Sequence, residues 1–245
     1  MMKSIGITDL GLRRENNEDS IFIHDDNYGS LPNLYIVADG MGGNNSGEIA
    51  SSRAIEYFCQ YVRNNSFSND EDILDFITSG IAFSNSRIYE DSTANEELAG
   101  MGTTMTVCSV KNSKVYIAHI GDSRLYIVGG GSMAQLTTDH SYVNEMVKAG
   151  EITEVEARVH PKRNIITRAL GVHESVEVDG RLIMAYANDH LLLCSDGLTN
   201  MITDQEIYST ITENSDIKLK AEKLIRLAIE NGGHDNISVI LISID

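Results

Sequence analysis

The sequence predicts an α+β fold in which antiparallel sheets and helices pack in layers. Apolar runs typical of buried strands come in closely spaced groups, whereas a doubly wound parallel sheet would place a helix after every strand. Long amphipathic helices stand between these groups of strands instead of alternating with single strands. No internal repeat, low-complexity tract or break in composition divides the 245 residues, so we expect one domain over residues 1–245.

The predicted strands are short runs of aliphatic and β-branched residues. They are Ile21–Ile23, Leu34–Ala38, Val115–Ile120, Leu125–Val128, Leu191–Cys194 and Ile237–Ile244. Two long helices are predicted over Glu48–Asn64 and Glu71–Ser92, because apolar residues recur there at helical spacing. Two further helices are predicted near Tyr142–Lys148 and over Ile217–Glu230, the second ended by Asn231-Gly232-Gly233.

Composition and charge exclude several classes of protein. The net charge is −17, with 36 acidic and 19 basic residues, which argues against nucleic acid as a ligand because the phosphate backbone requires a basic surface. The N-terminus lacks an apolar stretch of signal-peptide length, and no run approaches the roughly 18 apolar residues of a membrane helix. We therefore expect a cytoplasmic protein with no membrane partner. Cys59, Cys108 and Cys194 lie in apolar runs without metal-ligand spacing, which predicts buried, reduced thiols.

Acidic residues stand where the predicted strands begin or end. Asp39, Asp122 and Asp196 follow apolar runs, Asp235 directly precedes one, and Glu18-Asp19 stand just before Ile21–Ile23. A carboxylate at the edge of a buried core is costly unless a cation or a hydrogen-bond donor compensates. If these strand ends meet on one rim, they form an all-oxygen site, which suits Mg²⁺ and Mn²⁺ better than zinc.

Turns offer a second interpretation of some of these residues. Asp-Gly is common in tight turns, so Asp39-Gly40 and Asp196-Gly197, taken singly, are also consistent with simple turns. Asp179-Gly180 is predicted to be an ordinary turn of this kind. Gly129-Gly130-Gly131 lacks the Lys and the following helix of a phosphate-binding loop, and it is predicted to be a hairpin turn between two strands.

Short motifs spread along the chain occur in an order that resembles one family. They are Arg14–Asp19, Val37–Gly43, Gly47–Ser51, Gly100–Thr104, Ile120–Arg124, Leu136–Ser141, Ile166–Gly171, Ser195–Leu198 and His234–Asn236. With these motifs the chain resembles the bacterial branch of the metal-dependent (type-2C, PPM) protein serine/threonine phosphatases over essentially its whole length. The resemblance implies a four-layer αββα sandwich of two antiparallel sheets flanked by helix pairs. It also implies a mobile flap at about 141–164 that selects substrates beside the active site.

The resemblance further implies a metal centre of Mn²⁺ or Mg²⁺ ions, two per subunit with a third, weaker site. Asp39 would bridge the two ions, and the backbone carbonyl of Gly40 would complete one of them. Asp196 and Asp235 would bind one ion, and Glu18 would reach the other partly through water. Asp122, together with Asp196, matches the third position.

Two residues near the N-terminus receive catalytic roles from the resemblance. Arg14 would anchor the substrate phosphate, because a guanidinium group matches phosphoryl oxygens, and Asp19 would orient a metal-bound water. On composition alone Arg13 remains a rival to Arg14. Arg168 is interpreted as structural support.

The chain departs from the family pattern at two places. Met41 stands where animal members carry a His proposed as general acid, and a thioether cannot donate a proton, so the general acid is left unassigned. Gly42-Gly43-Asn44 replaces a Gly-Gly-His sequence found in many members.

The implied function is hydrolysis of phosphoserine and phosphothreonine in proteins by direct attack of a metal-bridging water or hydroxide. No nucleophilic Ser or Cys constellation is apparent, and Cys59, Cys108 and Cys194 have no adjacent base in sequence. We expect a monomer that acts on phosphorylated proteins and reverses the action of a cognate bacterial serine/threonine kinase. A phosphatase for small molecules or phosphotyrosine stays open as an alternative. A catalytically silent binding module is the other, although the four carboxylates Glu18, Asp39, Asp196 and Asp235 argue against it.

Overall fold

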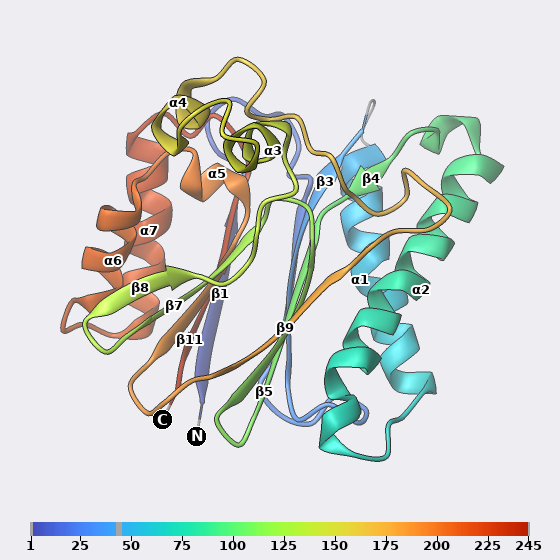
Figure 1. Ribbon diagram of the computed structural model, residues 1–245, viewed down its shortest axis with the longest axis horizontal. Coiled ribbons are helices and arrows are strands. Elements are labelled where there is room, and N and C mark those ends of the chain that lie inside the picture. Colours follow the sequence, from blue (N-terminus) through green and yellow to red (C-terminus); the bar gives the residue numbers. More distant parts are fainter. Residues whose placement is uncertain (1, 43–45, 245) are drawn as a thin grey trace.

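Two antiparallel sheets lie face to face in the computed structural model, which describes residues 2–42 and 46–244 (Figure 1). The first sheet has the order β1 (Lys3–Asp9), β11 (Ile237–Ser243), β10 (His190–Cys194), β7 (Arg124–Gly129) and β8 (Ser132–Gln135). The second has the order β2 (Asp19–His24), β3 (Leu34–Met41), β5 (Met105–Lys111), β6 (Lys114–Ile120) and β9 (Asp179–Met184), and the short β4 (Gly102–Thr103) pairs with β3. The predicted α+β fold with antiparallel sheets is confirmed.

Helices cover the outer face of each sheet, which gives four layers (Figure 1). The long helices α1 (Ser46–Asn64) and α2 (Ile73–Ala94) lie on the sheet that contains β3, and a 3₁₀ turn over Asp70–Asp72 leads into α2. Helices α6 (Asp204–Thr212) and α7 (Ile217–Glu230) lie on the other sheet. A second 3₁₀ turn, Glu96–Leu98, follows α2. All four predicted helices are present, with α1 starting two residues earlier than expected.

Strand β3 shows how one sequence serves two cores. Leu34, Ile36 and Ala38 pack toward α1 and α2, whereas Tyr35 and Val37 belong to the apolar layer between the sheets. Since successive side chains of a strand point to opposite faces, both faces must be apolar, and the run reads as continuously hydrophobic. The same alternation carries on past Val37 and assigns Asp39 to the layer between the sheets.

One edge of the sandwich carries the short helices. The α3 (Tyr142–Lys148), α4 (Glu154–Val159) and α5 (Asp196–Thr199) helices lie together there, at the end opposite to both chain termini (Figure 1). Lys3 pairs with Ser243, so the two ends of the described chain are neighbours in one sheet. In the described residues, no helix is both long and apolar enough to cross a bilayer.

Two turn predictions had different outcomes. Gly130 and Gly131 form the β7–β8 hairpin turn with φ values of 57° and 80°, as predicted, because glycine adopts positive φ at little cost. The prediction that Asp179-Gly180 is an ordinary turn was wrong. Asp179 opens β9 opposite His119 of β6, and Gly180 lies opposite Ala118, so sheet pairing overrides the local turn preference.

The cysteine prediction was correct. Cys59, Cys108 and Cys194 are all free and buried.

Candidate active site

The acidic residues predicted from the sequence meet at the edge of the sandwich that carries α3, α4 and α5. Asp19 of β2 lies directly opposite Asp39 of β3 in the strand register. Ile21 and Ile23 pack into the layer between the sheets, and Asp19 shares their face of β2. Strand alternation therefore directs Asp19 and Asp39 into the same inter-sheet space at its open end.

Asp19 is held by the facing sheet. The Ser195 hydroxyl donates to Asp19 Oδ2 at 2.7 Å, and Ser195 itself accepts the backbone N–H of Ser238 at 2.9 Å. Asp19 Oδ1 is buried and has no hydrogen-bond partner. Burial raises the pKa of Asp19 to about 7, and the charges of Asp196 and Asp235 add to that effect. This carboxylate therefore has one free oxygen for a cation or an ordered water.

Asp39 is fixed through its backbone. Its N–H donates to Thr104 Oγ1 at 2.9 Å, and its carbonyl accepts the N–H of Thr104 at 2.9 Å and the hydroxyl of Thr103 at 2.9 Å. Burial raises its pKa well above the usual value, and repulsion from Asp19, Asp196 and other carboxylates raises it further. The side chain keeps some exposure to solvent, so it is reachable from outside.

Asp196 lies just after β10 and Asp235 just before β11, two strands that pair with each other in the first sheet. Asp196 is the first residue of α5, and its Oδ2 accepts Asn200 Nδ2 at 2.9 Å. Burial raises the pKa of Asp196 to about 6, and the charge of Asp235 contributes. Gly197 permits the close approach, because a Cβ atom there would lie 2.0 Å from the carbonyl oxygen of Asn236.

Asn236 organises the N-terminal loop of the site, a role that was not predicted. Its Nδ2 donates to the carbonyls of Leu10 and Asn16, both at 3.0 Å, and its Oδ1 accepts the N–H of Glu18 at 2.8 Å. One buried amide thus satisfies three backbone groups of the segment that carries Arg14 and Glu18. The only signal in the sequence was its position directly after Asp235.

Arg14 brings a positive charge to this edge. Its Nη2 lies 2.7 Å from Asp235 Oδ2, and its Nη1 lies 3.5 Å from Glu18 Oε2. Arg14 is itself nearly half exposed, at 45%. Arg13 is an exposed residue of the same loop. Of the two arginines, Arg14 is thus the one that the structure places in contact with acidic residues of the site, and its role as phosphate anchor stays a prediction.

Asp122 and Asp196 both line a pocket of about 430 Å³. Helices α3 and α4 form one wall, and α5 with the start of α6 forms the other. Asp122 Oδ1 is buried and has no hydrogen-bond partner, and burial raises the pKa of Asp122 well above its usual value. Sequence reasoning predicted the Asp122–Asp196 neighbourhood but not the pocket.

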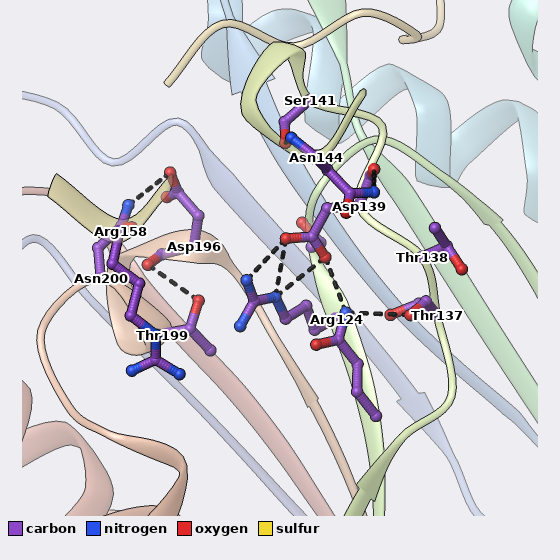
Figure 2. A network of polar contacts seen from close by, with 12 residues as sticks. Arg124, Thr137, Thr138, Asp139, Ser141, Asn144, Arg158, Asp196, Thr199 and Asn200 are labelled. Atoms are coloured by element: carbon purple, nitrogen blue, oxygen red, sulfur yellow. Dashed lines mark hydrogen bonds and ion pairs between the residues drawn. The ribbon is translucent and has the colours of Figure 1, made fainter. Parts of the chain in front are cut away.

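Arg124 and Asp139 both line this pocket and form an ion pair, as Figure 2 shows. Arg124 Nε lies 3.0 Å from both carboxylate oxygens of Asp139, and Nη2 lies 2.7 Å from Oδ2. Asn144 of α3 donates to the carbonyl of Asp139 at 2.6 Å, and Arg158 of α4 lies 3.5 Å from Asp204 of α6. These contacts attach the 141–164 segment to the rest of the molecule; its role as a flap stays a prediction.

The chemistry of the donors fits hard divalent cations. The described part of the chain contains no group of three or more His, Cys, Asp and Glu side chains that could hold a metal by itself. Mg²⁺ and Mn²⁺ do not need such a cage, since Mg²⁺ usually keeps several waters and binds through one or two carboxylates. Two buried carboxylate oxygens without partners, on Asp19 and Asp122, and the raised pKa values around them indicate uncompensated negative charge.

The remaining predicted residues are placed as follows. Gly40, whose N–H donates to the carbonyl of Glu18 at 3.0 Å, ends β3 together with Met41 at the site. Arg168 pairs with Asp179 at 3.2 Å and Glu177 at 3.3 Å, which agrees with a supporting role. Gly43 and Asn44, part of the departure from Gly-Gly-His, lie outside the described residues.

Comparison with known proteins assigns the class of this fold and site. The model of the family described as protein phosphatase 2C matches residues 13–224. The chain belongs to this family of metal-dependent protein phosphatases and is a phosphoprotein phosphatase.

Bacterial relatives are similar over nearly the whole chain. Protein phosphatase PhpP of Streptococcus pneumoniae is 37% identical over 239 residues, which cover 98% of this chain and 96% of the relative. The crystal structure of the serine/threonine phosphatase Stp1 from Staphylococcus aureus superposes with a TM-score of 0.94 at 34% identity, covering 100% of this chain and 96% of that one. The catalytic domain of the serine/threonine phosphatase PstP, in complex with 2 manganese ions, gives a TM-score of 0.85 at 33% identity, with coverage of 99% and 97%. These structures confirm the predicted family and its sandwich fold.

Proposed function

We propose that this protein removes phosphate from phosphoserine and phosphothreonine residues of other proteins with two divalent ions held by Glu18, Asp39, Asp196 and Asp235. The observation that carries the proposal is the meeting of these carboxylates with Arg14 at one edge of the sandwich. The names of Stp1 and PstP, both serine/threonine phosphatases, support the substrate class. The manganese complex of PstP supports Mn²⁺ as an ion that this site accepts, and Mg²⁺ has the same preference for oxygen ligands.

Bound divalent ions would neutralise the phosphate charge and activate water for attack on phosphorus. The chain's own residues orient the reactants. Arg14 binds the phosphoryl oxygens through its two terminal nitrogens, which already face the site. Asp19, whose Oδ1 is free of protein donors, accepts a hydrogen bond from the attacking water. Met41 has no proton to give, so the leaving alkoxide takes its proton from water or from another residue.

We also propose that the protein works in the cytoplasm as a monomer and opposes a serine/threonine protein kinase. The chemistry supports the last point, since phosphoserine and phosphothreonine in proteins are products of such kinases. The third metal position at Asp122 and Asp196 belongs to the same proposal, supported by their shared pocket.

The test compares purified protein in millimolar Mn²⁺ on peptides with phosphothreonine, phosphoserine or phosphotyrosine and on an aryl phosphate. We expect release of phosphate from the first two, and an Asp39→Asn loss of at least about 100-fold with the fold intact. Asp75→Asn, an exposed change on α2, serves as the matched control and should keep full activity. Activity confined to phosphotyrosine or the aryl phosphate would replace the proposed substrate, and full activity of Asp39→Asn would remove the ligand assignment.

A further inference from the structure

A buried histidine pair adjoins residues that line the pocket, Thr138, Asp139 and Ser141, and has no part in the proposed reaction. His119 of β6 and His140, the residue before the 141–164 segment, are 1% and 4% exposed. Their rings stack with centroids 4.9 Å apart and planes 29° apart. Both ring nitrogens of His119 have hydrogen-bond partners, Thr106 Oγ1 at 3.0 Å from Nδ1 and the Thr138 carbonyl at 3.1 Å from Nε2. His140 has different contacts, and one of them joins its ring to Gly121, the residue before Asp122.

His140 and Gly121 are joined by two hydrogen bonds. The His140 N–H donates to the Gly121 carbonyl at 2.8 Å, and the Gly121 N–H donates to His140 Nδ1 at 3.1 Å. Gly121 has φ of 108°, and a Cβ atom there would lie 2.5 Å from the Thr104 side chain, so this turn tolerates only glycine. The next residue is Asp122. The imidazole therefore sets the backbone from which the Asp122 carboxylate projects.

His140 also lies at the junction of both ends of the 141–164 segment. Its carbonyl accepts the N–H of Thr167 at 2.8 Å, and Ser141 forms a bridge with Ile166. One residue thus connects the start of this segment, its return and the Asp122 turn. A histidine that served only to fill space in the core would not need a ring nitrogen that accepts a hydrogen bond.

The contacts define the protonation state. An Nδ1 atom that accepts from Gly121 carries no proton, so the proton of the neutral ring is on Nε2. That atom lies 3.2 Å from Asp179 Oδ2, although outside the angles of a good hydrogen bond. The charged and titratable groups around the ring are Asp179 of β9, His119 of β6, Arg168 after the segment and Lys148 of α3. Burial lowers the pKa of His140, against the opposite effect of Asp179.

We propose that His140 is a positioning residue of this phosphatase, whose neutral Nδ1 atom holds the Gly121–Asp122 turn and couples it to the 141–164 segment. The inference rests on the proposed function, since Asp122 is useful only beside a metal and a phosphorylated substrate. His140 touches neither substrate nor metal. It acts through the Gly121 amide on the direction of Asp122.

Two amide substitutions divide the histidine's contacts between them. Asn in His140→Asn places an oxygen near the position of Nδ1 and can keep the bond from Gly121. Gln in His140→Gln reaches toward Asp179 but has a carbon at that position. We expect His140→Asn to keep kcat within about threefold of wild type. We expect His140→Gln and His140→Ala to lose about 10- to 100-fold in kcat and to need more Mn²⁺ for half-maximal activity, the range seen when supporting partners of metal sites are removed.

The outcome for a merely structural histidine is different. His140→Asn and His140→Gln would then lose melting temperature together, with no separation in kcat or in Mn²⁺ requirement, and the proposal would be overturned. His119→Asn serves as the matched control for loss of a stacked buried ring. It should lower the melting temperature without changing the Mn²⁺ requirement.

A measurement on the unmodified protein covers the case in which these variants do not fold. The imidazole ¹⁵N shifts of His140 at pH 7 should show an unprotonated Nδ1 and a protonated Nε2. A proton on Nδ1 would contradict the proposal directly. This readout does not depend on turnover, so it separates failure of the inference from failure of the proposed function, which wild-type inactivity on every phosphorylated substrate would show.

Discussion

At the edge of the sandwich that carries the candidate site, acidic side chains outnumber basic ones. Asp19, Asp39, Asp122 and Asp196 all have raised pKa values, first because they are buried and then because they repel one another. Arg14 is the cation that contacts Asp235 and Glu18. In the proposed reaction, bound divalent ions would neutralise the phosphate dianion, and Arg14 would serve as its fixed donor.

We predict that Arg14→Ala raises the KM for phosphopeptides about 10- to 100-fold, because a hydrogen bond to a charged group contributes roughly 1.5–3 kcal/mol. Arg14→Lys should recover only part of the loss, since an ammonium group cannot make the paired contacts of a guanidinium. Steady-state kinetics at saturating Mn²⁺ checks this. Arg13→Ala is the control from the same loop, and a larger effect from Arg13 than from Arg14 would reverse the assignment.

Which site residues were predictable follows from what each one does. A carboxylate beside an apolar run can be recognised in the linear sequence, and this is how Asp39, Asp122, Asp196 and Asp235 were predicted. Asn236 was not predicted, because its role is to satisfy the carbonyls of Leu10 and Asn16, more than 200 positions away. Asn236 comes close to these carbonyls only when β11 and β1 have paired.

Between elements, the site depends on glycines that allow backbones and side chains to touch. Gly47, in the first turn of α1, faces the Glu18 carboxylate, and a Cβ atom there would lie 2.4 Å from Glu18 Oε1. The two shortest clashes are with the end of the flexible Glu18 side chain, which can move, whereas the Gly40 carbonyl carbon at 3.1 Å has to give by only a few tenths of an ångström. Glu18 is the residue that would be displaced.

Gly47→Ala should therefore leave the fold intact and raise the Mn²⁺ concentration for half-maximal activity about 10-fold. Metal titration by calorimetry, together with the melting temperature of the chelated protein, checks the two parts. Gly80→Ala in α2 is the matched control, because its Cβ atom would meet Phe58 at 2.8 Å, far from the carboxylates. It should lower the melting temperature and leave metal binding unchanged; equal metal affinity in Gly47→Ala and wild type would contradict the role of this contact.

Elements with a strong local pattern were predictable, and elements formed by pairing were not. The apolar run of β10 and the helical spacing of α7 were placed within a residue. The start of β9 was interpreted as a turn because Asp179-Gly180 has turn chemistry, yet the register of β9 with β6 joins residues about 60 to 70 positions apart. Long-range pairing of this kind leaves little trace in a window of the sequence.

For the whole molecule, the raised pKa values of the carboxylates link folding to pH. Asp19 has a pKa of about 7 and Asp196 of about 6 in the folded chain, against about 4 for an unfolded aspartate. The folded state therefore binds more protons than the unfolded state in this range. Stability from these groups is complete below about pH 4 and is lost as pH rises through the folded values.

The buried histidines act in the opposite direction but in a different window. Burial lowers the pKa of His119 to about 4, so its neutral form favours folding, and that contribution is constant once the pH exceeds the unfolded value of about 6.5. Between pH 6.5 and 8.5 the change of folding stability with pH therefore comes mainly from the carboxylates of the candidate site. With 36 acidic against 19 basic residues, the chain has too few positive charges to neutralise its carboxylates.

We predict that the chelated protein loses about 3 °C in melting temperature between pH 6.5 and 8.5. Deprotonation of Asp19, with a pKa of about 7, and the end of the titration of Asp196, with a pKa of about 6, together cost about 1 kcal/mol of stability in this range. Saturating Mn²⁺ should remove most of this slope, since ions that bind only the folded state compensate the carboxylates and stabilise by mass action. Asp39→Asn should melt higher than wild type at pH 8.5 when chelated, because one repelling charge is gone, and should gain less from Mn²⁺. Thermal melts over a pH series, with and without chelator, check all three. A chelated protein whose melting temperature rises with pH across this range would contradict the raised pKa values of these buried carboxylates.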